Sequence, residues 1–358
     1  MKKIVILLVL FLLSCQPSVV KIALFSQSSK TLEKYKKGVE FAIDAINSEG
    51  GIGGHNLNLA ICKNRLDEAD GEKLSALFLG PSSERDIKKA VQLSEKNSIL
   101  LFFLFPYFKG GENSLFLSGD IISETSFLSD AASYSLHSNF ALVAEFDEKL
   151  AKCFGESFQK NGGKVETLNC LQLSSKEIKK KLEEIFSQKE TPQIIFFAGF
   201  EEENIEPFKD FFQKSVVMAP CSFFVLNNLE SYEGTLTTLS WFDANKKTGR
   251  IAEFQTNYQN KYGGKAENFS SLGYEAVFLL KNLLSQKTEG QKINEAIEKF
   301  NPLELELSGK LFFDNGGILN RRASLAVARD GEIQDLSFVE RDVLKGLQEK
   351  VVQERVKK

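Results

Sequence analysis

Side chains that do chemistry in enzymes are present in this chain, but none stands in a spacing that an enzyme uses. The two histidines, His55 and His137, belong to no metal-ligand pattern. The sequence contains no Gly-x-Ser-x-Gly turn, no phosphate-binding loop and no helix with a pair of zinc-binding histidines. The glycine-rich stretch Gly50–Gly54 follows an expected helix and precedes an expected strand, the reverse of the phosphate-binding order. We therefore expect no enzyme activity, no metal and no cofactor.

The amino-terminal residues carry the one cysteine for which the sequence predicts a covalent modification. Lys2 and Lys3 precede an apolar run, Ile4–Leu13, that is too short to span a bilayer, which is typical of a secretory signal peptide. The sequence Leu12-Leu13-Ser14-Cys15 resembles the lipobox of bacterial lipoproteins, in which the cysteine thiol is alkylated by a diacylglyceryl group. The resemblance implies that residues 1–15 are a lipoprotein signal ending at a lipidated Cys15. The mature chain would be extracytoplasmic and attached to a membrane through its lipid alone. The alternative is a plain secretory signal with a cysteine there by chance.

Composition and length describe an ordinary folded protein of two domains. About 340 residues follow Cys15, which is above the size at which one hydrophobic core usually divides. Apolar residues make up 42% and charged residues 26% of the chain, its net charge is −3, and no basic stripe indicates nucleic acid. Four further cysteines, Cys62, Cys153, Cys170 and Cys221, allow three sets of disulfide pairs. Cys153–Cys170 is the pair to test first, because both cysteines lie on one expected helix–strand unit.

Short apolar strands alternate with amphipathic helices along most of the chain. Val20–Phe25 has the composition of a buried strand, and Thr31–Asn47 carries apolar residues at helical spacing. Ser83 and the acid three residues later have the spacing of a helix cap. The alternation restarts after residue 138, which predicts two α/β lobes, each with a doubly wound parallel sheet. Other expected elements include a strand at Ala76–Leu79, helices at Ser126–Ser135 and Asn204–Lys214, a loop at Lys109–Ser118 and a tail helix at Val343–Lys358.

Several segments together resemble the leucine/isoleucine/valine-binding proteins, which are type I periplasmic binding proteins that feed ABC importers. The residues Gly38–Asn47 and Gly50–Leu57 match the end of that family's first helix, its glycine-rich turn and its second strand. Tyr258–Gly263, Gly273–Ala276 and Ser308–Gly317 match later motifs in the same order. Each motif is weak by itself, but together they cover nearly the whole mature chain.

The resemblance implies the periplasmic binding protein-like I fold, in which two lobes joined by a hinge close around a ligand. It also implies a monomer that binds a small molecule, presents it to an ABC permease and contacts no nucleic acid. The aromatic side chains and serines expected at the cleft predict a ligand that is amino acid-like, amide-like or aromatic acid-like. The expected domains are a signal at residues 1–15, one lobe at 20–138 plus about 268–320, a second at 139–267 plus about 321–340, and a charged tail helix at 341–358.

Candidate ligand-binding residues follow from the rule that open parallel sheets bind ligands beyond the carboxyl ends of their strands. The rule selects loops rather than single atoms, and each residue has a structural alternative. The two serines are equally explained as a helix cap, and the aromatic residues as a cover over the hinge. The candidates are Gln27, Ser82, Ser83, Tyr107, Phe146, Phe200, Cys221 and Trp241.

The position of Cys221 bears on the ligand and on a second possible function. In the amino-acid binders an acid after a Gly-Pro pair takes the ligand's ammonium group, but here the loop reads Ala219-Pro220-Cys221-Ser222. An ammonium buried without a carboxylate is unfavourable, so the sequence argues against a branched-chain amino acid. The alternative function is an envelope lipoprotein that uses the same fold to bind and regulate a protein partner such as a cell-wall synthase.

Overall fold

The computed structural model describes residues 19–63, 65–69, 73–108, 110–199, 205–221, 232–240, 249–286, 302–314, 317–319, 323–329, 332–336 and 346. The chain divides into two compact units, each assembled from separate stretches of sequence. Unit 1 comprises Met1–Leu104, Gly111–Leu115 and Ala244–Gly317, and unit 2 comprises Phe105–Gly110, Phe116–Asp243 and Ile318–Lys358. Among the helices that the structure describes, none is both long enough and apolar enough to cross a membrane.

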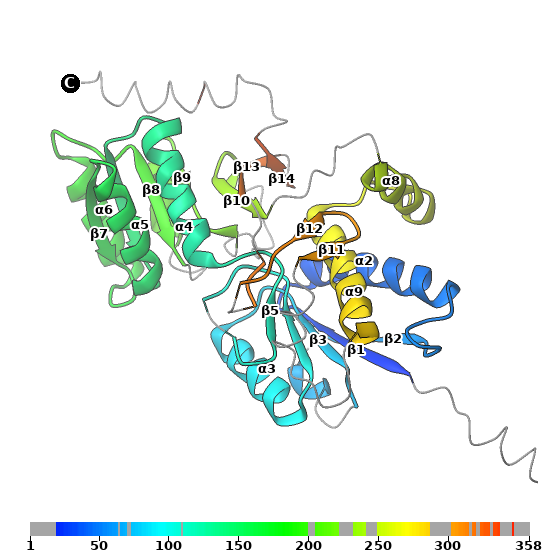
Figure 1. The fold of residues 1–358 in the computed structure, drawn as a ribbon. Helices are drawn as coiled ribbons and strands as arrows, with labels where there is room; N and C mark the ends of the chain where they lie inside the picture. Colours follow the sequence, from blue (N-terminus) through cyan, green and yellow to red (C-terminus); the bar gives the residue numbers. More distant parts are fainter. Residues whose placement is uncertain are drawn as a thin grey trace, which may run out of the picture. The chain divides into compact units, whose positions relative to one another are not determined.

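Unit 1 is built on a five-stranded sheet in the order β2-β1-β3-β4-β5 (Figure 1). The inner strands β1, β3 and β4 pair in parallel, and β3 and β4 are buried along their whole length. Strands buried on both faces are typical of parallel sheets covered by helices. The bounds are β1 Val20–Phe25, β2 Leu57–Cys62, β3 Ala76–Leu79, β4 Leu100–Phe103 and β5 Ser114–Phe116, with a 3-10 turn η1 at Leu66–Ala69, helix α3 at Glu84–Asn97 and a small hairpin of β11 (Leu303–Leu305) and β12 (Gly309–Leu311).

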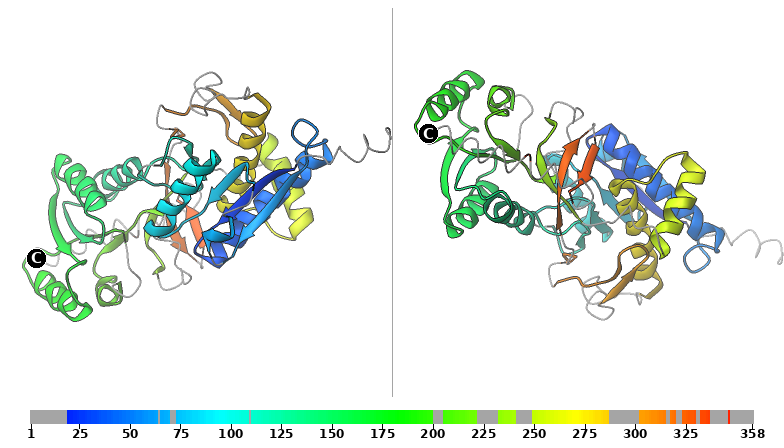
Figure 2. Two further views of the ribbon diagram at one scale, coloured as in Figure 1. Left: turned by 90° about the horizontal axis from the view of Figure 1, so that it is seen from below. Right: turned by 90° about the horizontal axis from the view of Figure 1, so that it is seen from above.

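Two glycines allow a close approach between helices α2 (Ser29–Ser48) and α9 (Asn268–Gln286), which lie side by side in unit 1 (Figures 1 and 2). A Cβ atom on Gly38 would lie 1.8 Å from the carbonyl oxygen of Ser270, and one on Gly273 would lie 2.6 Å from that of Tyr35. The Ser270 hydroxyl also donates to the carbonyl of Lys34 at 2.9 Å. Helix α2, from the amino-terminal part of the chain, therefore packs closely against α9, from its carboxyl-terminal third.

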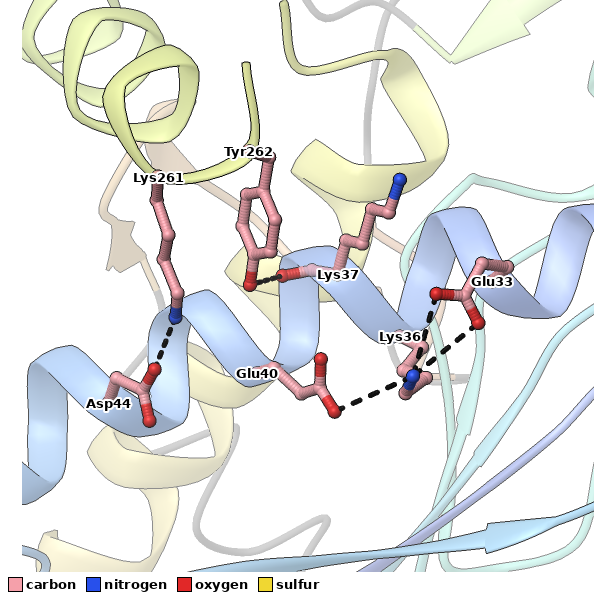
Figure 3. A network of polar contacts seen from close by, with 7 residues as sticks. All are labelled: Glu33, Lys36, Lys37, Glu40, Asp44, Lys261 and Tyr262. Atoms are coloured by element: carbon pink, nitrogen blue, oxygen red, sulfur yellow. Dashed lines mark hydrogen bonds and ion pairs between the residues drawn. The ribbon is translucent and has the colours of Figure 1, made fainter. Parts of the chain in front are cut away.

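Helix α8 (Gly249–Tyr262) packs on the same helix α2 through polar contacts, which Figure 3 shows, and through aromatic contacts. The hydroxyl of Tyr262 donates to the carbonyl of Lys37 at 3.2 Å, and Lys261 forms an ion pair with Asp44. The ring centroid of Phe41 lies 5.7 Å from that of Tyr258 and 6.3 Å from that of Tyr262. These contacts explain why α8 clusters with unit 1, whereas the sequence-based bounds place residues 249–262 in the second lobe.

Unit 2 has a seven-stranded sheet in the order β14-β13-β10-β9-β8-β6-β7 (Figure 1). The pairs from β7 to β10 are parallel, whereas β13 runs antiparallel to β10 and β14 antiparallel to β13. The bounds are β6 Phe140–Glu145, β7 Lys164–Asn169, β8 Ile194–Ala198, β9 Val216–Met218, β10 Leu236–Ser240, β13 Ala323–Arg329 and β14 Glu332–Asp335.

Each face of the unit 2 sheet has its own hydrophobic core. Along β8, Ile194 and Phe196 face one core, and Ile195 and Phe197 face the other, as the two-residue repeat of a strand requires. The first core is covered by α4 (Ile121–Asp130), its π-helical extension η2 (Ala131–Ser135) and α5 (Glu148–Lys160); the second is covered by α6 (Ser175–Phe186) and the 3-10 helix η3 (Glu206–Phe211).

The cysteine pair to test first, Cys153–Cys170, forms no disulfide. Cys153 lies on α5 and contacts the hydroxyl of Ser126 on α4 at 3.5 Å. Cys170 follows β7 and belongs to the core on the opposite face of the sheet. The helix–strand unit was correctly expected, but it places the two thiols on opposite sides of a β-layer.

Three local expectations also differ from the structure. Helix α4 begins at Ile121 rather than Ser126, because the side chain of Asp120 accepts from the amide of Ser123 and caps it. The expected loop at 109–118 contains β5, and within the expected helix Asn204–Lys214 the residues Glu206–Phe211 form the 3-10 helix η3. The expected tail helix, apart from residue 346, lies outside the described residues.

Candidate functional site

The carboxyl ends of β1 and β3 form a polar edge in unit 1, and they bring Gln27 next to Ser82 and Ser83. The amide of Gln27 and the hydroxyl of Ser26 both donate to the carbonyl of Pro81, at 3.1 and 3.2 Å. Gly80 makes this closure possible, since a Cβ atom there would lie 2.8 Å from Ser26 Cβ. Ser26 is buried, whereas Gln27 is exposed. Gln27 is therefore available to a ligand, and Ser26 holds the two loops together.

The two serines after β3 are engaged within unit 1. The hydroxyl of Ser82 donates to the carbonyl of Gly80 at 2.8 Å. Ser83 is the N-cap of α3: its oxygen accepts from the amide of Asp86, and its hydroxyl donates to the Asp86 carboxylate at 2.7 Å. The cap is confirmed, and Asp86 contacts the capping hydroxyl. The Asp86 carboxylate already lies near the helix N-terminus, which disfavours a second negative charge there.

At the corresponding edge of unit 2, Phe146 is a core residue. It is 9% exposed, and its ring stacks on that of Phe197 at 6.4 Å. The amides of Phe146 and Asp147 both donate to the carbonyl of Ala198, which joins the ends of β6 and β8. The Asp147 side chain accepts from the amide of Leu150 at 2.9 Å and caps α5. Of the two explanations for Phe146, these contacts support packing.

Of the other aromatic candidates, the structure describes Tyr107. Tyr107 is half-buried in unit 2, with its ring 6.1 Å from that of Phe105 and 5.7 Å from that of Phe108. Phe200, Trp241 and Cys15 lie outside the described residues.

A carboxylate that sequence reasoning missed lies beside Cys221. Glu124, in the first turn of α4, accepts through Oε1 from the amide of Cys221 at 2.5 Å and from the hydroxyl of Thr238 in β10. Its second oxygen, Oε2, is buried and has no hydrogen-bond partner among the described residues. Cys221, not an acid, follows Pro220, but the fold brings a carboxylate to this position from 97 positions earlier in the chain.

The surroundings of Glu124 disfavour its charged form. Burial raises the pKa of its carboxyl to about 7, although the donors Thr238 and Cys221 act in the opposite direction. The nearby Asp120 carboxylate adds a smaller increase. Burial also raises the pKa of the Cys221 thiol, and the charge of Glu124 raises it further, so this cysteine is an unreactive thiol.

The sequence held one signal for Glu124 that could have been used. Helix α4 buries Ile121, Thr125 and Leu128, and Glu124 lies on that same face. An ionisable residue on the apolar face of a helix is rarely buried without a partner or a function. Its contact with Cys221 could not be predicted, because it depends on how α4 packs beside β9 and β10.

The polar groups at the two edges are suited to binding a ligand. No group of three or more histidine, cysteine or acidic side chains among the described residues could hold a metal ion. The unit 1 edge offers the Gln27 amide and neighbouring hydroxyls, and the unit 2 edge offers one unsatisfied carboxylate oxygen. Such groups can orient a polar ligand by hydrogen bonds.

Comparisons with known proteins identify the fold. The sequence matches no protein-family model and no curated protein. Solved structures match over 88% or more of the chain. An ABC transporter substrate-binding protein from Desulfitobacterium hafniense has a TM-score of 0.69 at 17% identity, with 99% of it covered. The chain has the fold of the type I periplasmic binding proteins.

Two other solved structures with this periplasmic binding protein fold contain ligands. LivJ from Streptococcus pneumoniae, in complex with isoleucine, matches with a TM-score of 0.68 at 17% identity over 88% of this chain and 98% of LivJ. A solute-binding protein of an ABC transporter from R. palustris, in complex with benzoate, matches with a TM-score of 0.64 at 12% identity over 89% and 96%. The fold expected from the motifs is thus confirmed, as two α/β units with parallel sheets.

Proposed function

We propose that this chain is the solute-binding component of an ABC importer and captures a small extracytoplasmic ligand. The observation that supports this most strongly is the structural likeness, which extends over nearly the whole length of several solute-binding proteins. The ligands in those structures include an amino acid and an aromatic acid. We infer a ligand of the same general size, amino acid-like, amide-like or aromatic acid-like.

The ligand is proposed to bind at the carboxyl ends of the parallel strands, where open α/β sheets bind small molecules. In unit 1 the exposed Gln27 is the strongest candidate for a contact, and the oxygens of Ser82 and Ser83 are secondary ones because their hydroxyls donate within the unit. In unit 2 the candidate region is the turn at Cys221. Tyr107, Phe200 and Trp241 stay as proposed contacts with an apolar part of the ligand.

We further propose that the mature protein begins at a lipidated Cys15. Acyl chains contribute about 0.8 kcal/mol per buried CH2, so more than one chain anchors a folded domain stably to a membrane. Metabolic labelling with a radioactive fatty acid should mark the wild-type protein and not Cys15→Ala. Label retained in Cys15→Ala would exclude this site.

A thermal-shift screen tests the solute-binding function. The probes are amino acids, short amides and aromatic acids, added singly to the purified chain. A ligand at a hundred times its Kd stabilises the folded state by about 2.7 kcal/mol, so at least one probe should raise the Tm clearly. No shift with any probe, together with co-purification of a cell-wall enzyme, would contradict solute binding and favour the partner-binding alternative.

A further inference from the structure

Glu124 is held in place by its first oxygen and left unsatisfied at its second. Thr238 and the main chain at Cys221 both donate to Oε1, so the position of the carboxylate is fixed from two elements, β10 and the turn after β9. Oε2 is buried, and no partner for it lies among the described residues. An acceptor that is buried without a donor destabilises the fold, and more so when it is charged.

A purely structural role does not require a carboxylate here. Thr238 and the Cys221 amide need one acceptor oxygen, which a glutamine amide would supply without carrying a charge. The ion pairs among the described residues do not include Glu124, and the neighbouring charged group is Asp120, which has the same sign. The carboxylate is thus an unfavourable choice for the fold alone, which is typical of functional sites.

The position of Glu124 agrees with a role in binding. The turn at Cys221 follows β9 and lies at the carboxyl end of the parallel strands, where Ala219 pairs with β10 through the carbonyl of Leu236. This is the end of the sheet at which ligands of open α/β folds bind. Among the residues that the structure describes, no donor completes Oε2, and water or a ligand can supply one.

We propose that Oε2 of Glu124 receives a protonated nitrogen of the ligand, so that the solute is a small compound with a primary ammonium or amidinium group. This inference rests on the solute-binding function proposed above and narrows its ligand class. It also removes the ground on which the sequence argued against amino acids, because the acid missing from the loop at Cys221 is replaced by one from α4.

The proposal predicts a definite pH dependence of binding. The charged and titratable groups described around Glu124 are Asp120 on its own helix and the Cys221 thiol after β9; Thr238 of β10 is neutral, and Cys153 of α5 bonds to Ser126 and Ile122 instead. An ammonium group binds the ionised carboxylate, which forms as the pH rises through the pKa of Glu124. Affinity for an amine should therefore increase up to tenfold per pH unit below that pKa and level off above it.

Matched probes test the role of the nitrogen. Calorimetry would compare L-phenylalanine with 3-phenylpropanoate, L-leucine with 4-methylpentanoate, and benzamidine with benzamide, each pair differing in its cationic nitrogen. We expect at least one cationic member to bind more tightly than its partner by tenfold or more. Glu124→Gln should remove that preference, whereas Glu156→Gln, at an exposed position of α5, should keep it.

The possible outcomes distinguish failure of the Glu124 inference from failure of the proposed solute-binding function. Amines that bind wild type and Glu124→Gln equally, or binding restricted to compounds without a cationic nitrogen, would overturn the inference and leave solute binding intact. No binding by these probes or by the wider screen would overturn both. If Glu124→Gln does not fold, a pH-independent amine affinity in the wild type between pH 5 and 8 would overturn the inference by itself.

Discussion

The polar side chains at the carboxyl ends of the strands differ between the two units in how fully they are hydrogen-bonded. In unit 1, Ser26 donates to the neighbouring loop at Pro81, and Ser82 and Ser83 donate within their own loop. The hydroxyl of Tyr35 donates to the carbonyl of Leu104 at 2.6 Å. In unit 2, Glu124 accepts two hydrogen bonds on one oxygen and none on the other within the described chain. Satisfied groups stabilise an edge, and an unsatisfied one indicates an incomplete site. Chemistry at the two edges should therefore respond differently to mutation and to pH.

The largest effect is expected from the helix contact that supports unit 1. Gly38→Ala would place a methyl group 1.8 Å from the Ser270 carbonyl, so α2 and α9 would have to separate. We expect a loss of roughly 3 kcal/mol or more in the free energy of unfolding, measured by urea denaturation, with the same loss at pH 6 and pH 8. Gly264→Ala, where no atom lies within 4 Å of the added Cβ, serves as the control. A wild-type stability in Gly38→Ala would show that the two helices are not packed as described.

A pH-dependent effect on stability is expected in unit 2. The folded protein keeps a proton on Glu124 up to a pKa of about 7, whereas the unfolded chain releases it near the ordinary value of 4.5. The folded state thus binds more protons in this window, and stability falls as the pH rises through it, by about 3 kcal/mol in total. Glu124→Gln lacks this titration, so its stability relative to wild type should increase by that amount between pH 4.5 and 8. Urea denaturation at several pH values measures the difference, and parallel curves for the two proteins would contradict it.

Helix caps give a smaller effect, which should be similar in both units. Ser83→Ala removes the cap of α3 in unit 1, and Ser174→Ala removes that of α6 in unit 2, where Ser174 and Glu177 form a reciprocal capping box. Each should lower the free energy of unfolding by about 1 kcal/mol. Ser83→Ala should change ligand affinity less than twofold, because its hydroxyl already contacts Asp86. A tenfold loss of affinity in Ser83→Ala would assign that serine to the ligand rather than to the helix.

The smallest effect on stability is expected at Gln27. This side chain is exposed, so Gln27→Ala should change the free energy of unfolding by less than about 0.5 kcal/mol. If the unit 1 edge contributes to the site through Gln27, ligand affinity measured by calorimetry should fall about threefold to tenfold. An unchanged affinity would leave unit 2 as the side of the protein that supplies the described polar contacts.

Much of the fold could be predicted because its signals are local. The apolar run Val20–Phe25 is β1, and the helical repeat through Tyr35 and Val39 is the buried face of α2. The cap Ser83 was predicted from its spacing to an acid three residues later. β5 was missed because three residues carry no measurable period.

The site could be predicted only where a loop by itself determines the contact. Ser82 and Ser83 follow a strand directly, and their position at its end is local information. Glu124 meets Cys221 and Thr238 through the packing of α4 beside two strands that come about a hundred residues later. Sequence reasoning missed Glu124 because the helix was expected to begin at Ser126, and no spacing in the sequence indicated its partners.

A carboxyl NMR titration of Glu124 tests the central claim most directly. Protein labelled with 13C at the glutamate side chains would be titrated with and without the amine that binds most tightly, and the spectrum of Glu124→Gln would identify the signal. The account predicts a pKa near 7 in the free protein and a lower pKa in the complex, because a bound cation favours the charged carboxylate. A pKa near 4.5 in the free protein, or one that does not change when the amine binds, would contradict it.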